Sequence, residues 1–196
     1  MLKKIYYKIA EIKFKHQINY LGKNTQLRLN GRVIEGKYVH LESDVHIEKN
    51  WIIAVYPKFG GKNNPVSTKV GAGVCIGERC SINRNLTIYC ADSVKIGKDV
   101  LFGSYDLITD NDHGMNPNLD VPYYEQPLIT SPVSIGDGCW IAENVKILRG
   151  SIIGEKCIVA ANSVVKGKFP AYSIIAGNPA KVVKKWNFEK SEWEKV

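Results

Sequence analysis

The chain has 196 residues, of which 44% are hydrophobic and 23% charged, a composition typical of one globular domain and not of a disordered chain. Its formal net charge of +8 is compatible with nucleic acid, an anionic membrane surface or a phosphate-bearing ligand, but no nucleic-acid motif accompanies it. The five cysteines contain no C-x-x-C pair, so we expect neither a disulfide framework nor a zinc ribbon.

Residues 1–26 are predicted to begin with an amphipathic helix that caps the domain. Leu2, Ile5, Ile9 and Ile12 recur at helical spacing, with lysines around them. This apolar side is expected to pack on the domain that follows or, alternatively, to dock on an anionic membrane. No apolar run approaches the ~20 residues of a membrane span, and charges interrupt the N-terminus where a signal peptide would be apolar. We therefore expect a cytoplasmic protein.

A period of six residues dominates the chain from residue 76 onward. Every sixth position is Ile, Val or Phe, with one two-residue slip and one longer gap. The series is Ile76, Ile82, Ile88, then Ile96, Phe102, Ile108, then Ile135, Ile141, Ile147, Ile153, Val159 and Val165. A weaker series precedes it, at Leu27, Val33, Val39, Val45 and Trp51.

A period of six is neither the 2 of a strand nor the 3.6 of a helix. It predicts a coil that turns a corner every six residues, with one bulky side chain per face pointing inward. Three faces make a turn of eighteen residues, and stacked turns form an all-β triangular prism of parallel strands around one shared core. We predict this β-helix over residues 27–185, with excursions at 57–69 and 114–132. The tail, 186–196, is predicted to be a helix because Trp186 and Trp193 lie one heptad apart.

Three motifs go beyond the repeat: N-R-N-L-T at 83–87, T-D-N-D-H-G at 109–114, and G-N-P-A-K-V at 177–182. In this order and spacing the chain resembles the hexapeptide-repeat acyltransferases, in particular the galactoside and maltose O-acetyltransferase branch. The resemblance implies a left-handed parallel β-helix and acetyl-CoA as co-substrate. It also implies a homotrimer, with active sites in the clefts between subunits.

His113 is the expected catalytic residue. A base with a pKa near 6.5 can remove the proton of a hydroxyl while its oxygen attacks a thioester carbonyl, and histidine has that value unperturbed. The resemblance implies that His113 is this base and that transfer is direct. Judged from the residues alone, it could equally be a loop histidine in an Asn/Asp/Gly turn. The cysteines at the fifth position of their hexads, Cys80, Cys139 and Cys157, are expected to be structural.

The resemblance also assigns binding residues. Asn83 is expected to bind the acceptor, whereas Asn85 is expected to be structural. The pantetheine arm of the donor is expected beside Trp140, Ala142 and Ala161, and a backbone N–H near Ala142 is expected to stabilise the developing oxyanion. The phosphate and adenine end is expected at Lys166, Pro179, Lys181 and Lys184. A purely structural role stays open for Asn83 and Trp140, and a solvated basic tail for the lysines.

No metal site is expected, because His40 and His46 are six residues apart and so lie on different faces of the coil. The excursion 114–132 holds four prolines and Tyr123-Tyr124 where the sugar acetyltransferases have an arginine, so the acceptor is undetermined. We predict an O-acetyltransferase that modifies a saccharide of a capsule, O-antigen or exopolysaccharide. The alternatives are N-acetylation of an amino sugar nucleotide, O-acetylation of serine, and a non-catalytic β-helix scaffold.

Overall fold

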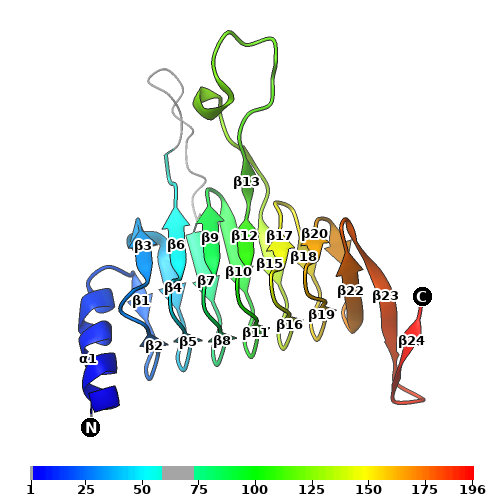
Figure 1. Ribbon diagram of the computed structural model, residues 1–196, viewed down its shortest axis with the longest axis horizontal. Coiled ribbons are helices and arrows are strands. Elements are labelled where there is room, and N and C mark those ends of the chain that lie inside the picture. The colour runs from blue at the N-terminus through cyan, green and yellow to red at the C-terminus, as the bar shows by residue number, and fades with distance from the viewer. Residues whose placement is uncertain (1, 59–72) are drawn as a thin grey trace.

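The computed structural model describes residues 2–58 and 73–196, so most of the predicted excursion 57–69 lies outside the described residues. The chain forms a left-handed parallel β-helix, as predicted, whose coils stack side by side around one core (Figure 1). Each coil contributes one short strand to each of three sheets, and these sheets are the three faces of the prism.

The first face consists of β1 (Tyr20–Leu21), β4 (Val39–Leu41), β7 (Gly73–Ile76), β10 (Ser93–Ile96), β15 (Val133–Ile135), β18 (Ile152–Ile153) and β21 (Lys168–Phe169). The second face consists of β2 (Gln26–Leu27), β5 (His46–Ile47), β8 (Ser81–Ile82), β11 (Leu101–Phe102), β16 (Trp140–Ile141), β19 (Ile158–Val159) and β22 (Ser173–Gly177). The third face consists of β3 (Arg32–Ile34), β6 (Ile52–Val55), β9 (Thr87–Cys90), β12 (Leu107–Thr109), β17 (Lys146–Ile147) and β20 (Val164–Val165). His40 and His46 therefore lie on different faces, as the spacing predicts.

The core is the one that the period predicts. All twelve residues of the main six-residue series are buried, none of them more than 3% exposed. They stack in register between coils: Ile82 pairs with Phe102, and Phe102 with Ile141. Each inward side chain thus packs on its counterparts above and below, which is how stacked coils bury a surface that no single coil could cover.

The predicted coil length of eighteen residues holds only for the first coil after the arm, and the last coil has sixteen residues. Ser134 pairs with Ile152, eighteen residues on, but Tyr20 pairs with His40, twenty residues on. The inward series after Val33 consequently continues at Leu41, Ile47 and Ile53, so the prediction at Val39, Val45 and Trp51 was wrong in register. Those three residues are buried nonetheless: Val39 is the first residue of β4, and Val45 and Trp51 directly precede β5 and β6.

Two corners of the prism differ in regularity. At the regular corner, where the chain passes from the second face to the third, described links are always four residues long, such as 83–86, 103–106, 142–145 and 160–163. In every link after the first, the third residue has a positive φ, between 60° and 67° at Asn50, Asn85, Tyr105, Asn144 and Asn162. Asparagine tolerates this left-handed conformation better than most residues, which confirms a structural role for Asn85.

At the interrupted corner, where the chain passes from the third face back to the first, the links differ in length. Residues 91–92 and 166–167 turn the corner directly, whereas residues 110–132 leave the prism as an arm (Figure 1). The antiparallel strands β13 (Asn111–Asp112) and β14 (Ile129–Thr130) form the base of this arm, and the short 3₁₀ helix η2 (Tyr123–Glu125) lies farther out. The arm confirms the excursion predicted from the break in the period.

The N-terminal end of the stack is covered by helix α1 (Leu2–Lys15), which confirms the predicted helix (Figure 1). Phe14 is fully buried, and its ring lies 5.0 Å from that of Trp51. The first coil already begins at β1, so the boundary predicted at residue 27 is too late. No helix in the described part of the chain is long and apolar enough to cross a membrane.

The C-terminal prediction was wrong: the tail is a β-hairpin and not a helix. The parallel coils end at Gly177, after which β23 (Ala180–Asn187) runs back antiparallel to β22 and β24 (Glu192–Lys195) pairs with β23. Trp186 and Trp193 are directly opposed across the hairpin, with ring centroids 5.3 Å apart. A separation of seven residues suits one face of a helix, but it also suits a cross-strand pair around a turn, and Ser191 has the positive φ of that turn.

Candidate active site

His113 lies at the base of the arm, immediately after β13, and its side chain is exposed. The coil ladder does not extend this far, so other contacts must fix the segment that carries the imidazole. One of them is the pairing of β13 with β14, in which Asn111 lies opposite Thr130 and Asp112 opposite Ile129.

The second contact is made by Asp110, whose side chain is fully buried. Its Oδ1 accepts hydrogen bonds from the N–H of Ala91 at 2.7 Å and from Asn111 Nδ2 at 2.9 Å. Its Oδ2 accepts from the N–H of Asp92 at 2.8 Å and from Cys90 Sγ at 3.2 Å. Asp110 thereby ties the first residues of the arm to the corner of the preceding coil, three residues before His113.

Two further contacts hold the neighbours of His113. The guanidinium of Arg149, from the next coil, forms an ion pair with Asp112. On the other side, Gly114 packs so closely on Gln126 that a Cβ at Gly114 would lie 2.4 Å from Gln126 Cβ. Gln126 is itself buried and binds both the N–H and the carbonyl oxygen of Asn116. His113 is therefore carried by a fixed segment between two anchored neighbours.

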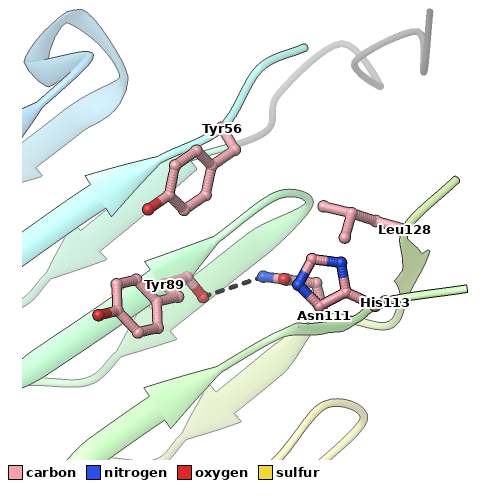
Figure 2. Close-up of a pocket in the computed structure, with 5 residues that line it drawn as sticks. All are labelled: Tyr56, Tyr89, Asn111, His113 and Leu128. Carbon is pink, nitrogen blue, oxygen red and sulfur yellow. Dashed lines mark hydrogen bonds between the residues drawn. The ribbon is translucent and has the colours of Figure 1, made fainter. Parts of the chain in front are cut away.

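A hollow of about 230 Å³ opens beside His113 and is lined by Tyr56, Tyr89, Asn111, His113 and Leu128 (Figure 2). The rings of Tyr56 and Tyr89 lie 6.3 Å apart, and their hydroxyl groups point away from the imidazole. Asn111 Nδ2 donates to the Tyr89 carbonyl oxygen at 3.3 Å. Burial raises the pKa of Tyr56, so its phenol stays neutral near pH 7. The hollow thus offers carbon-rich walls next to one titratable imidazole.

Asn83, Ala142 and Ala161 lie at the regular corner and not beside His113. The N–H of Asn83 donates to the Phe102 carbonyl oxygen, and that of Ala142 to the Val159 carbonyl oxygen, so these corner positions stack coil upon coil. Asn83 is exposed and lines a separate hollow of about 450 Å³, together with Glu48, Lys49, Arg84 and Ser104. The Ala142 N–H is already bound to the Val159 carbonyl oxygen, so it is not free to bind an oxyanion. The expected oxyanion donor is therefore not the N–H of Ala142 itself.

Trp140 and two of the predicted lysines are placed along the second face. Trp140 lies on β16 and is 49% exposed, so its ring is mostly outside the core. Trp140 pairs with Ile158 on β19, which pairs with Ile174 on β22, which pairs with Lys184 on β23. Lys181, also on β23, pairs with Ala176 on β22. Pro179 lies in the tight connection between β22 and β23. Lys166, by contrast, lies at the interrupted corner, on the same side of the prism as His113.

Within one chain the predicted residues therefore form two groups. His113 and Lys166 lie at the interrupted corner, and the other seven lie at the regular corner, on the adjoining second face or at its β23 end. Sequence reasoning missed Tyr56, Tyr89 and Leu128, because they come from three separate segments and have no shared spacing. It also missed Asp110, although an acidic residue at the point where the period breaks was a usable signal. Tyr123 and Tyr124 are exposed on the arm and do not line the hollow.

The cysteines at the fifth hexad positions point into the core, in agreement with a structural role. The thiols of Cys80, Cys139 and Cys157 donate to the carbonyl oxygens of Gly97, Gly154 and Pro170, each at 3.1 Å. Burial raises the pKa of Cys80 to about 11, which keeps the thiol protonated. Among the residues that the structure describes, no group of histidine, cysteine and acidic side chains is placed to hold a metal ion.

Residues 132–167 match the family model "Bacterial transferase hexapeptide (six repeats)". Over 133 residues the chain is 41% identical to the putative lipopolysaccharide biosynthesis O-acetyl transferase WbbJ of Escherichia coli, an alignment that covers 64% of this chain and 68% of WbbJ. It is 34% identical to the probable acetyltransferase Rv3034c of Mycobacterium tuberculosis, over 84% of this chain but only 49% of that protein. It is 27% identical to the galactoside O-acetyltransferase of E. coli, over 82% of this chain and 79% of that enzyme.

Solved structures share the fold at lower identity. A mutant of AntD, an N-acyltransferase from Bacillus cereus in complex with dTDP and coenzyme A, superimposes with a TM-score of 0.74 at 19% identity, covering 94% of this chain and 92% of AntD. A galactoside acetyltransferase in complex with coenzyme A gives a TM-score of 0.64 at 20% identity, and the superposition covers 96% of this chain and 78% of that enzyme. The repeat, the architecture and the identity to WbbJ agree, and the chain belongs to the hexapeptide-repeat acyltransferases.

Proposed function

We propose that the protein transfers an acetyl group from acetyl-CoA to a hydroxyl group of a saccharide, with His113 as the general base. The observation that carries the proposal is the placement of His113, on an anchored segment and next to a hollow walled by Tyr56 and Tyr89. Aromatic rings suit the C–H faces of a sugar ring, and the imidazole beside them can reach a hydroxyl of the bound sugar. WbbJ is named as an O-acetyl transferase of lipopolysaccharide biosynthesis, which supports a surface polysaccharide as the acceptor.

The proposed reaction needs one base and no acyl-enzyme. His113 takes the proton of the acceptor hydroxyl while its oxygen attacks the thioester carbonyl. The tetrahedral intermediate collapses with cleavage of the C–S bond, and the sulfur leaves with the proton that the imidazolium returns. The products are an acetyl ester and coenzyme A with a free thiol. The buried cysteines take no part in this route.

We further propose a homotrimer in which each active site lies between two subunits. His113 and the donor residues Trp140, Ala142 and Ala161 are at different corners of one prism, so a single chain does not bring them together. In a trimer of parallel prisms, the interrupted corner of one subunit can face the regular corner of the next. Lys181, Lys184 and Pro179 would then hold the phosphate and adenine end of the donor, and Lys166 would reach it from the subunit that supplies His113.

The direct test measures thiol release from acetyl-CoA with a panel of soluble saccharides. His113→Ala is expected to lower kcat about 10²–10⁴-fold and to leave the Kd for acetyl-CoA unchanged, because the donor residues lie elsewhere. His16→Ala removes another exposed histidine and serves as the control with full activity. A His113→Ala protein that turns over like the wild type would overturn the assignment of the base. A wild-type protein that does not bind acetyl-CoA would favour the scaffold function instead.

N-acetylation of an amino sugar nucleotide is the second candidate, favoured by the similarity in fold to AntD, which was solved with dTDP-4-amino-4,6-dideoxyglucose. The two reactions leave different bonds. Hydroxylamine cleaves an acetyl ester but not an acetamide, so treating the product separates them. Serine belongs in the same panel, since O-acetylserine is also an ester. A hydroxylamine-resistant product would replace O-transfer with N-transfer while leaving the donor site unchanged.

A further inference from the structure

Helix α1 presents apolar side chains on two opposite sides. One side faces the prism and includes Ala10 and Phe14, both fully buried. The opposite side carries Ile5, Ile9 and Ile12, which are 48%, 51% and 56% exposed. An amphipathic helix needs one apolar side to pack on its own domain. The second side of α1 is therefore not explained by the fold.

The position of α1 leaves this second side uncovered. The helix lies across the N-terminal end of the stack of coils (Figure 1). Its packed side contacts the first coil through β1 and β2, and the three isoleucines are exposed on the opposite side of the helix. A flat surface that met this side of α1 would touch the isoleucines.

The charges around the isoleucines are basic. Residues 1–18 contain five lysines (Lys3, Lys4, Lys8, Lys13 and Lys15) and one acidic residue, Glu11. Lys8 and Lys15 are exposed on one flank of the isoleucines, and the carboxylate of Glu11 is already paired with Lys8 at 3.0 Å. Lys13 lies on the other flank, where its Nζ donates to the Leu29 carbonyl oxygen at 2.8 Å. The apolar strip is thus bordered by the exposed Lys8 and Lys15 on one flank, while the ammonium of Lys13 is held against the prism.

We propose that the outward side of α1 docks on the surface of an anionic lipid bilayer. With fourteen residues the helix is too short to span a bilayer, but it has the length and the pattern to lie in the interface with its isoleucines among the acyl chains. The lysines would then lie at the level of anionic headgroups. A second copy of the chain fits this surface poorly, because an identical helix would bring lysine against lysine.

Docking through α1 goes beyond the proposed acetyl transfer and does not depend on it. Neither His113 nor any donor residue is on α1, so catalysis on a soluble acceptor and binding to lipid should be separable. In the proposed trimer of parallel prisms, the three copies of α1 would face the same way, and three weak contacts would add up to firm attachment.

The experiment measures co-sedimentation of the full chain with vesicles. Wild-type protein is expected to bind vesicles of phosphatidylcholine mixed with phosphatidylglycerol, to bind pure phosphatidylcholine far more weakly, and to detach as salt is raised. The triple variant Ile5→Gln, Ile9→Gln, Ile12→Gln keeps good helix formers at all three positions and should lower the affinity at least about a hundredfold. Replacing Lys8 and Lys15 by Gln should lower it roughly fivefold for each lysine.

The matched control removes three exposed apolar side chains from the other end of the molecule: Val183→Gln, Phe188→Gln and Val196→Gln on the C-terminal hairpin. This variant should bind vesicles like the wild type. The proposal is overturned if wild-type protein does not sediment with anionic vesicles, or if the α1 variant binds as well as the control. It is also overturned if the α1 variant changes the oligomeric state without lipid, because a second copy would then cover the isoleucines. Thiol release with a soluble acceptor, which the α1 variant should retain, reports separately on the proposed function.

Discussion

Asp106 is buried at the regular corner and Asp110 at the interrupted corner, and the hydrogen-bonding capacity of these two carboxyl groups is met very differently. Asp106, at the regular corner, is 2% exposed; its Oδ1 accepts from the Val145 N–H at 2.7 Å. Its Oδ2 has no hydrogen-bond partner among the described residues. Asp110, at the interrupted corner, has donors on both carboxylate oxygens. Burial raises the pKa of Asp106 to about 7, since little offsets the loss of water.

The difference shows what each corner requires from a side chain. At the regular corner the coils pair mainly through their backbones, and side chains as different as those of Trp51, Leu86, Val145 and Ser163 occupy the positions equivalent to Asp106. At the interrupted corner the ladder stops, which leaves the N–H groups of Ala91 and Asp92 without a strand to pair with. The carboxylate of Asp110 accepts the two hydrogen bonds that a neighbouring strand would otherwise accept. The segment that carries His113 is therefore held by one carboxylate that binds two backbone N–H groups, whereas the regular corner is held mainly by backbone pairing.

The largest expected effect tests whether the two corners cooperate between subunits. His113→Ala removes the proposed base, and Ala161→Trp fills the exposed donor position at the regular corner; each variant alone should be nearly inactive. Mixed trimers, co-expressed with two tags and purified through both, should regain about a third of wild-type activity, because one of the three sites then combines two intact corners. Mixed trimers as inactive as their parents would show that the corners do not share a site.

The second prediction concerns the pH dependence of Asp106. A carboxyl with a pKa of about 7 in the folded chain and about 3.9 in the unfolded chain binds more protons when folded, so stability should fall as pH rises between these values. The shift corresponds to about 4 kcal/mol. The difference in the free energy of unfolding in urea between the wild type and Asp106→Asn (wild type minus variant) should therefore decrease by about that amount from pH 4 to pH 8. A difference that does not change with pH would contradict the assignment.

The third prediction concerns Asp110. Asp110→Ala leaves two backbone N–H groups without their charged acceptor and should lower the free energy of unfolding by about 3 kcal/mol at pH 7. Thiol release should fall as well, because the segment before His113 loses its anchor. Asp106→Ala, measured at pH 8, should cost clearly less, since it removes a carboxylate that is poorly satisfied. Equal costs for the two variants would remove the contrast between the corners.

The smallest effect is expected at the ion pair between Arg149 and Asp112. Arg149→Gln should lower kcat about fivefold, because it loosens the residue next to His113, and should change the free energy of unfolding by no more than about 1 kcal/mol. Arg149→Lys should restore most of the activity. Arg79→Gln breaks an ion pair with Asp99 away from the site and is the matched control. A control that loses as much activity as Arg149→Gln would show that the pair has no positioning role.

The features that could be predicted from the sequence were mainly those that recur in every coil. One inward residue per face had to be bulky and apolar in every coil, so the core positions from Ile76 to Val165 could be assigned from their spacing alone. The two-residue slip between Ile88 and Ile96 marks one such coil in the sequence, but the twenty-residue coils before it were not predicted, because their extra residues fall at the interrupted corner, between inward positions. The hollow beside His113 was not predictable either, since Tyr56, Tyr89 and Leu128 are brought together only by the stacking of coils and the return of the arm.

The paired residues on the second face also set the distance between Trp140 and Lys184. Trp140, Ile158, Ile174 and Lys184 lie on four neighbouring strands, so three strand spacings of about 4.8 Å separate the tryptophan from the lysine, or about 14 Å in total. Inserting one coil between residues 153 and 169 would lengthen this span by about 5 Å and leave the arm untouched. In the proposed donor site, such an insertion would separate the pantetheine contact at Trp140 from the phosphate contact at Lys184 by one more strand spacing.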